Sequence, residues 1–207
     1  MIAGVVLAGG ASRRMGRDKA LVEVGGRPMA AHVLDALRAN GFDGPIVYGG
    51  DPGALASLEV PVLPDAHPGE GPVGGVLGAL GAVGKRSGVD AAIVVPCDIP
   101  RLDASVLAPL RERWVDGPPV DVVVARTDRI EPICAIWSVE VTDRVESAFR
   151  AGERALHRVL ERVDVAEVEV PAAPLHNVNT PADLADVVDT SAAPDTYRPD
   201  TCSPDAV

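Results

Sequence analysis

A run of cations follows two adjacent glycines near the start of the chain. Gly9 and Gly10 end an apolar stretch, and residues 13–19 then carry four cations: Arg13, Arg14, Arg17 and Lys19. Adjacent glycines tolerate positive φ and leave backbone N–H groups uncovered, so an anion can approach the main chain. Arg gives bidentate contacts to phosphate and Lys gives a point charge. The stretch predicts a polyphosphate-binding loop, and the alternative is a tight turn followed by a solvated basic segment.

The spacing of this stretch matches neither of the two common phosphate loops. Five residues rather than four separate Gly10 from Gly16, and two more separate Gly16 from Lys19, so the stretch is neither Walker A nor GxGxxG. The whole chain is acidic, with 19 Lys and Arg against 30 Asp and Glu and a formal charge of -11. A local group of cations in such a chain concentrates anions that the remaining surface repels, which favours phosphate binding.

Two carboxylates directly follow apolar runs. Asp98 lies in the segment PCDIP after the run 91–95, and Asp65 follows the run 60–63. The carboxyl end of a strand in a doubly wound sheet is the usual place for a ligand-binding residue, so Asp98 is a candidate metal ligand. The alternative for Asp98 is that it only braces a turn before the helix expected from Asp103.

Polar residues in the last third of the chain form another candidate group. Asn177 and Asn179 precede Thr180-Pro-Ala-Asp183, a typical helix start in which Thr180 is the N-cap and Asp183 closes the capping box. Asn177 is accordingly either a binding residue or a loop-former. Arg154 lies at a junction between two expected helices, where it makes either a solvated ion pair or a phosphate contact.

Apolar runs and helical patterns alternate along the chain and must position these groups. Strands are expected at 2–8, 45–48, 60–63, 91–95, 120–125, 132–137 and 165–170, the sixth of them possibly antiparallel. Helices are expected at 28–40, 76–84, 103–115, 139–150, 155–162 and from Thr180. This alternation predicts a single three-layer, Rossmann-like α/β domain with a mostly parallel sheet over residues 1–189. Residues 190–207 are rich in Pro, Ser, Thr and Asp and are expected to form a disordered acidic tail.

Composition excludes several classes of protein. An isoelectric point of about 4.7 argues against binding to nucleic acid or to an anionic membrane surface, and a small anion is the expected partner. No run of about eighteen apolar residues is present to span a membrane. The three cysteines are far apart and form no CxxC, so they indicate neither a disulfide framework nor a zinc site. A reduced, cytoplasmic setting is expected.

Six segments taken together resemble the molybdenum cofactor guanylyltransferases of the MobA-like nucleotidyltransferase superfamily. In order, over roughly residues 3–188, they are LAGGxSxRMGxDK, DxxPGEGPVGG, PCDIP, EPICAIW, GERAL and HNVNTPADL. The first segment alone marks only the superfamily, which includes cytidylyltransferases, whereas the combination is typical of the guanylyl branch. The resemblance implies the nucleotide-diphospho-sugar transferase fold and transfer of GMP from GTP to the phosphate of molybdopterin carrying molybdenum, with Mg²⁺ and with release of pyrophosphate.

The resemblance also implies a role for individual residues. Those assigned to the nucleotide are Leu7, Ala8, Gly9, Gly10, Lys19, Asp65 and Asp98. Those assigned to catalysis are Arg14, Lys19 and Asp98, with Asp98 as the Mg²⁺ ligand. Those assigned to the acceptor are Arg154, Asn177 and Asn179. A phosphate nucleophile is ionised at neutral pH, so the reaction requires charge neutralisation and positioning rather than a general base.

One departure from the family pattern follows the second expected strand. Relatives carry an asparagine near the base there, whereas this chain has Tyr48-Gly49-Gly50-Asp51, so a base contact at this place comes from the backbone, from Asp51, or not at all. Three alternatives to the main hypothesis stay open. They are a cytidylyltransferase, a guanylyltransferase for another phosphorylated acceptor, and a nucleotide-binding protein without catalysis.

Overall fold

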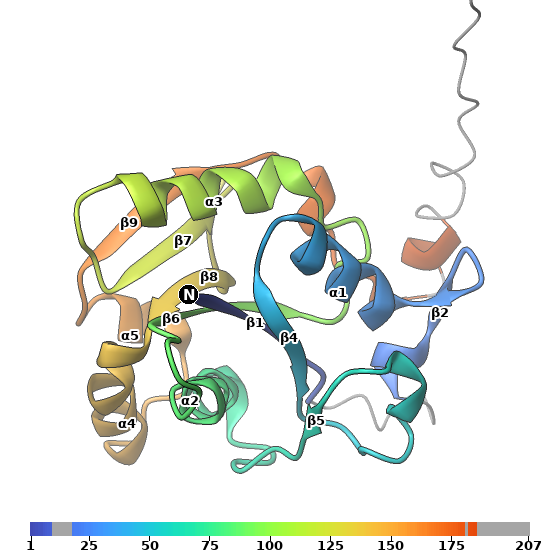
Figure 1. Ribbon diagram of the computed structural model, residues 1–207, viewed down its shortest axis with the longest axis horizontal. Coiled ribbons are helices and arrows are strands. Elements are labelled where there is room, and N and C mark those ends of the chain that lie inside the picture. The colour runs from blue at the N-terminus through green and yellow to red at the C-terminus, as the bar shows by residue number, and fades with distance from the viewer. Residues whose placement is uncertain (10–17, 181, 186–207) are drawn as a thin grey trace, which may run out of the picture.

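A seven-stranded sheet runs through the molecule in the order β5-β4-β1-β6-β8-β7-β9 (Figure 1). The computed structural model describes residues 1–9, 18–180 and 182–185, so Gly10, Arg14 and the expected tail lie outside the described residues. The strands are β1 (Ile2–Leu7), β4 (Asp43–Tyr48), β5 (Val62–Leu63), β6 (Ala91–Pro96), β7 (Val122–Arg126), β8 (Ile130–Ser138) and β9 (Val165–Glu169). β8 is antiparallel to β6 and β7, and the other pairings are parallel, which confirms the mostly parallel sheet.

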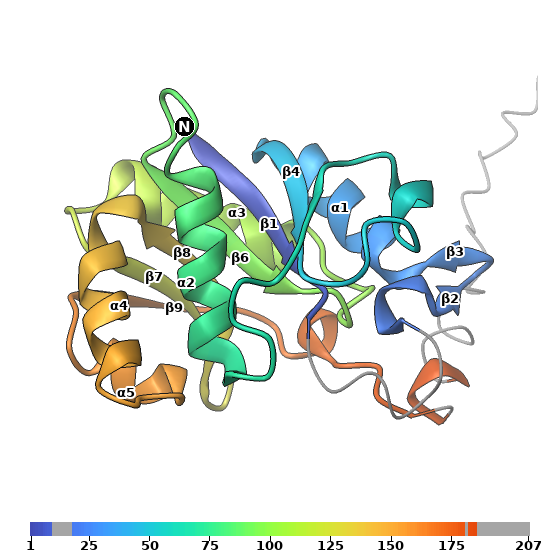
Figure 2. The ribbon, with the colours of Figure 1, turned by 90° about the horizontal axis from the view of Figure 1, so that it is seen from below.

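Helices cover both faces of the sheet and give the three expected layers. The helices α1 (Met29–Ala39) and α3 (Ala104–Asp116) cover one face. The helices α2 (Gly71–Val83), α4 (Thr142–Arg150) and α5 (Leu156–Leu160) cover the other (Figure 2). Shorter elements connect them: η2 (Lys19–Leu21), β2 (Glu23–Val24), β3 (Arg27–Pro28), η3 (Ala56–Leu58), η4 (Val139–Val141) and η5 (Ala173–Leu175).

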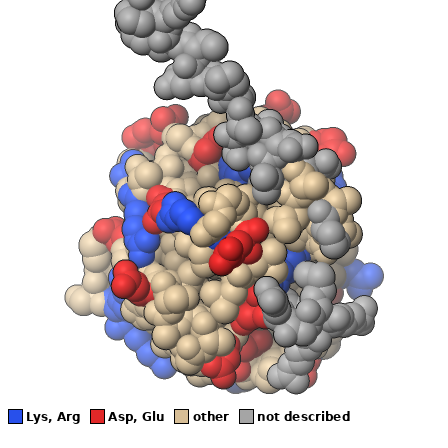
Figure 3. All heavy atoms as spheres, turned by 90° about the vertical axis from the view of Figure 1, so that its right-hand side faces the viewer, with Lys and Arg blue, Asp and Glu red and all other residues tan. Residues whose placement is uncertain are grey.

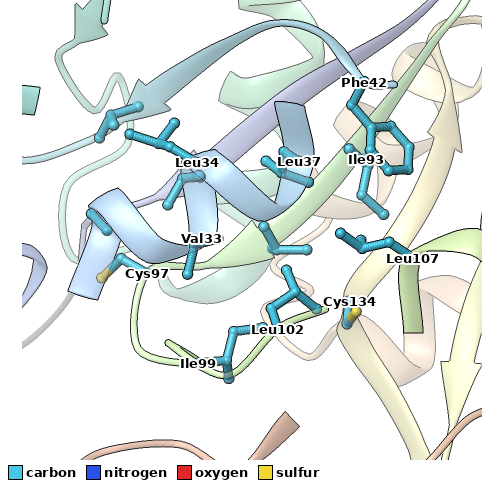
Figure 4. Close-up of a cluster of buried hydrophobic side chains, with 14 of the residues drawn as sticks. Val33, Leu34, Leu37, Phe42, Ile93, Cys97, Ile99, Leu102, Leu107 and Cys134 are labelled. Carbon is cyan, nitrogen blue, oxygen red and sulfur yellow. The ribbon is translucent and has the colours of Figure 1, made fainter. Parts of the chain in front are cut away.

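The core lies in two apolar layers, one on each side of the sheet. Every residue of β1 is buried, as expected for a parallel strand that is covered on both faces. In the layer under α1, Val33 and Leu37 pack with Ile93 of β6 (Figure 4). The same layer contains Cys97 and Cys134, and burial raises the pKa of each thiol to about 12. The surfaces that pack between the helices and the sheet are apolar on both sides. Polar side chains that could bind a ligand are therefore expected in the loops that follow the strands.

The start of α2 differs from the expectation, whereas the start of α3 agrees with it. α2 begins at Gly71 rather than at Val76, with Pro72 in its first turn, where proline is preset for the helix and needs no N–H partner. α3 begins directly after Asp103, whose Oδ1 accepts a hydrogen bond from the Ser105 N–H at 2.9 Å. Pro109 lies inside α3. Asp103, not Asp98, is therefore the cap of this helix.

One face of the molecule carries a mixture of charges rather than a basic field. On the face drawn in Figure 3, the described Lys and Arg side chains lie among Asp and Glu side chains. Such a mixture does not concentrate a polyanion, so the exclusion of nucleic acid stays the expectation. Among the helices that the structure describes, none has the length and apolar character needed to cross a membrane.

Candidate active site

The carboxyl ends of four neighbouring strands meet at one edge of the sheet. In β1, Leu7 is paired with Tyr48 of β4 and with Pro96 of β6, and Tyr48 is paired with Leu63 of β5. The Ala8 N–H donates to the Tyr48 carbonyl at 2.9 Å, which extends the pairing past the end of β1. Parallel pairing in register therefore brings the segments that follow β1, β4, β5 and β6 to the same edge, where ligands bind in open α/β sheets.

Gly9 lies in close contact with Gly49 and Asp65. A Cβ on Gly49, which has φ +92°, would lie only 2.6 Å from the Gly9 nitrogen. A Cβ on Gly9 would lie 3.2 Å from Oδ2 of Asp65. The absence of side chains at both glycines thus allows the Asp65 carboxylate to approach the start of the glycine-rich stretch.

Tyr48 and a backbone N–H hold the segment that carries Asp65. Oδ1 of Asp65 accepts a hydrogen bond from the His67 N–H at 2.8 Å, and the Tyr48 hydroxyl accepts one from the Ala66 N–H at 2.9 Å. Tyr48 is buried, and desolvation is the main reason that its pKa is raised. Sequence reasoning treated Tyr48 only as a departure from the family pattern. An aromatic residue at the end of an expected strand, in a chain that also contains a glycine-rich helix, was the signal in the sequence that could have indicated this role.

Lys19 connects two segments that are far apart in the chain. Its Nζ donates to Oδ2 of Asp98 at 2.5 Å and to Oδ1 of Asn179 at 2.6 Å. The side chains of Lys19 and Asp98 are only 15% and 16% exposed. Asp18 fixes the start of this η2 turn, since its Oδ1 accepts a hydrogen bond from the Ala20 N–H at 3.1 Å. The ion pair is partly desolvated, so its electrostatic attraction is stronger than that of a surface pair.

Asp98 has one carboxylate oxygen that is free for a ligand. Its Oδ1 is buried and accepts no hydrogen bond from any residue that the structure describes. A buried carboxylate oxygen without a partner is costly, and a hard divalent cation is the kind of ligand that would satisfy it. The described part of the chain contains no group of three or more His, Cys, Asp or Glu that could hold a metal ion. Oδ1 of Asp98 is therefore a candidate ligand for a divalent cation.

The segment Asn177–Asn179 is anchored at its middle residue. Val178 is buried with Val24 and Met29, and its N–H donates to the Asp98 carbonyl at 2.8 Å. The two asparagines that flank Val178 are exposed. This alternation explains how one short segment can both pack on the protein and present two amides to a ligand.

The expected capping box after this segment is present. Oδ2 of Asp183 accepts hydrogen bonds from the N–H groups of Asn179 and Thr180, each at 2.8 Å, and the Asp183 N–H donates to Oγ1 of Thr180 at 3.2 Å. The backbone hydrogen bond from Asn179 is the main cause of the lowered pKa of Asp183. Pro181 lies outside the described residues. The box holds the Asn179 backbone and so supports the contact of this side chain with Lys19.

A cavity of about 380 Å³ opens beside Asn179. Its lining is mostly polar and consists of Thr127, Asp128, Arg129, Glu131, Ala172, Leu175, His176, Asn177, Asn179 and Asp183. Asn177 and Asn179, both predicted on the acceptor side, thus line one cavity, and Asn179 also contacts Lys19. Four of the lining residues were not predicted: Thr127, Asp128 and Arg129 of the β7–β8 turn, and Glu131 near the start of β8. Nothing in this polar stretch distinguishes it from any surface loop.

Arg154 contacts a different part of the edge. Its guanidinium pairs with Glu70, the residue before α2, and lies 4.1 Å from the centre of the Phe149 ring. Glu70 belongs to the segment that begins at Asp65. Of the two alternatives for Arg154, the structure shows the ion pair, and this pair connects Arg154 to the segment that carries Asp65.

Comparison with known proteins identifies the family. Residues 4–168 match the family model of the MobA-like NTP transferase domain. A molybdenum cofactor guanylyltransferase of Cereibacter sphaeroides is 36% identical over 184 residues, which cover 88% of this chain and 93% of that protein. The one of Rhizobium meliloti (strain 1021) is 34% identical over 191 residues, with 87% of each chain covered.

Solved structures agree with the sequence comparison. The crystal structure of molybdopterin-guanine dinucleotide biosynthesis protein A from Archaeoglobus fulgidus has a TM-score of 0.72 at 26% identity and covers 92% of this chain and 99% of that one. A cytidylyltransferase from Thermus thermophilus has a TM-score of 0.69 at 16% identity, covering 93% and 100%, and shares the fold. The chain therefore belongs to the MobA-like NTP transferase family, as a nucleotidyltransferase of the molybdenum cofactor guanylyltransferase branch.

Proposed function

We propose that the protein transfers GMP from GTP to the phosphate of molybdopterin carrying molybdenum and releases pyrophosphate. One observation carries the proposal: Nζ of Lys19 donates both to Asp98, the candidate cation ligand, and to Asn179, which lines the neighbouring cavity. An ammonium group at this junction can stabilise charge on a phosphorus centre that is shared by a nucleotide and an acceptor. The names of the relatives supply the identity of the substrates.

The nucleotide is proposed to bind at the end of β1. Leu7, Ala8, Gly9 and Asp65 lie together there, and Gly10 and Arg14, outside the described residues, belong to the same proposal. Asp65 contacts the guanosine, and Lys19 and Arg14 contact the triphosphate. Asp51 is occupied by the turn that follows β4, because its Oδ1 accepts a hydrogen bond from the Ala54 N–H at 2.8 Å. Oδ1 of Asp65 accepts a similar hydrogen bond, from the His67 N–H, so Asp65 is favoured as the acidic group near the nucleoside by the position of its Oδ2 beside Gly9.

The acceptor is proposed to occupy the cavity lined by Asn177 and Asn179. An oxygen of its phosphate attacks the α-phosphorus of GTP, and the bond from that phosphorus to the pyrophosphate oxygen breaks as the new bond forms. The attacking phosphate is already ionised at neutral pH, so this chain needs to supply only position and charge neutralisation. Nucleotidyltransferases of this kind generally use a divalent cation. Asp98 is proposed to hold Mg²⁺, whose contribution is to neutralise charge on the phosphate oxygens.

The test is product formation by the purified chain with GTP, Mg²⁺ and molybdenum-bearing molybdopterin. The expected result is a product whose mass equals that of the acceptor plus GMP less water, with one pyrophosphate released per product. GTP binding without release of pyrophosphate would contradict the proposal and indicate a binding protein without catalysis. A cytoplasmic location is part of the proposal and is supported by the free thiols of Cys97 and Cys134.

A further inference from the structure

We infer that Arg154 is a positioning residue for the nucleotide-binding segment 65–71 and does not contact the acceptor. The inference rests on the proposed function only in taking Asp65 as a nucleotide contact. Arg154 lies at the junction of α4 and α5, opposite the N-terminal end of α2.

The guanidinium of Arg154 is held on several sides. Its Nε and Nη2 both approach Oε2 of Glu70, at 2.8 and 2.7 Å, and its Nη1 donates to the carbonyls of Phe149 and Glu153 at 2.8 and 3.0 Å. A Cβ on Gly71 would lie 3.6 Å from the carbonyl oxygen of Arg154, so the two segments are in contact along the backbone as well. An exposed ion pair alone contributes little to stability. The hydrogen bonds to the Phe149 and Glu153 carbonyls, however, fix the direction in which the planar Arg154 guanidinium points.

A second series of contacts leads from the same junction to Asp65. The Phe149 ring, over which the Arg154 guanidinium lies, is 4.8 Å from the His67 ring between centres. The His67 N–H donates to Oδ1 of Asp65, whose Oδ2 lies beside Gly9. The junction therefore holds the segment at His67 and at Glu70, and the carboxylate that faces the nucleotide is positioned between these residues and the end of β5.

The acceptor cavity is built from other elements. Its lining comes from the β7–β8 turn with Glu131 and from described residues of the segment after β9, whereas the contacts of Arg154 are with Glu70, Phe149 and Glu153. A change at Arg154 should consequently alter the affinity for nucleotide and leave the acceptor's KM unchanged.

The experiment compares Arg154→Gln, Glu70→Gln and the double variant with Arg150→Gln as the matched control. Arg150 is the last residue of α4, four positions before Arg154; it pairs with Glu146 at 2.8 Å and its side chain is 75% exposed. The Kd for GTP is measured by titration calorimetry with Mg²⁺ and without acceptor. We expect about a threefold to tenfold weaker affinity for each single variant, the magnitude typical of a change within a coupled network. The double variant should be no weaker than Arg154→Gln, because both substitutions break the same contact.

Amide hydrogen exchange in the absence of ligand provides an independent readout. Exchange within residues 65–71 should rise in Arg154→Gln and Glu70→Gln and stay unchanged in the control. Unchanged GTP affinity in Arg154→Gln, with or without a lower melting temperature, would overturn the inference, and so would a raised acceptor KM at unchanged GTP affinity. If the unaltered chain bound CTP or ATP more tightly than GTP, or formed no product, the proposed function would fail. The same Kd comparison, made with the nucleotide that binds most tightly, would still decide the role of Arg154.

Discussion

At the scale of single residues, Lys19 and Asp98 depend on each other. Each side chain is mostly buried and is the charged partner of the other, so removal of one leaves a poorly solvated charge. The two roles differ, however. Nζ of Lys19 donates to both Asp98 and Asn179, whereas Oδ1 of Asp98 is buried and accepts no hydrogen bond from any described residue.

Lys19→Ala should slow turnover with GTP strongly. Loss of one preorganised charge contact in a closed site costs about 2–4 kcal/mol of transition-state stabilisation. The loss should appear in kcat, measured by pyrophosphate release, with a smaller effect on the melting temperature. Turnover equal to that of the unaltered protein would mean that residues 7–19 form only a basic surface loop.

Asp98→Asn should abolish the response to Mg²⁺ while the protein still folds. The amide keeps the shape of the side chain but lacks the charge that a hard cation requires. Asp103→Asn is the matched control, because Asn also caps a helix well and Asp103 lies in the same loop. A full Mg²⁺ response in Asp98→Asn, measured as turnover against Mg²⁺ concentration, would reduce Asp98 to a structural partner of Lys19.

At the scale of elements, α2 and β4 meet through a glycine. A Cβ on Gly78 would overlap the phenol of Tyr48, whereas a Cβ on Gly81 would meet no atom within 4 Å. Gly78 thus lets the helix pack on the side chain that holds the Asp65 segment.

Gly78→Ala should destabilise the protein and Gly81→Ala should stabilise it. Alanine in place of glycine inside a helix gains up to about 1 kcal/mol. Overpacking of a buried site costs about 1–3 kcal/mol and exceeds this gain at Gly78. Chemical denaturation of both variants measures the difference. A Gly78→Ala protein that is as stable as Gly81→Ala would show that Tyr48 is not fixed in this position.

Most long elements were predictable from sequence, and the short ones were not. β1 and β6 are continuous apolar runs, which only a strand covered on both faces requires. The hairpin of β2 and β3 has two residues in each strand, too few for any periodicity. Its one signal was the Gly25-Gly26 pair, both with positive φ, which is typical of a two-residue hairpin turn.

At the scale of the whole molecule, sequence patterns identify those residues of the candidate site whose choice does not depend on strand order. Asp65 and Asp98 could be found because each follows an apolar run. The order β5-β4-β1-β6-β8-β7-β9 and the position of the β7–β8 turn beside the cavity at Asn179 depend on long-range pairing, which local patterns do not encode. The division at residue 189 and the role of residues 190–207 stay predictions.

The thiols of Cys97 and Cys134 should be unreactive in the folded protein. Burial raises the pKa of each from 9.0 to about 12, so the thiolate is absent at pH 8 and the sulfur is also covered. Labelling by iodoacetamide, read by mass, should modify these two residues only after unfolding. Rapid labelling at pH 8 would contradict their burial.

The same two thiols should make stability depend on pH. Their contribution to the free energy of unfolding is complete below pH 9 and falls as the pH rises towards 12, because the unfolded chain then loses protons that the folded chain retains.

Competition between nucleotides tests the central claim most directly. Guanine presents adjacent N1–H and N2–H₂ donors, whereas cytosine presents acceptors, so a pocket that contains the Asp65 carboxylate should favour guanine. The measurement incubates the unaltered chain with equal GTP and CTP, Mg²⁺ and molybdenum-bearing molybdopterin, and compares the two dinucleotide products by mass. We predict at least about a tenfold excess of the guanine product, which corresponds to about 1.4 kcal/mol. Equal amounts of the two products, or an excess of the cytosine product, would contradict the assignment as a guanylyltransferase.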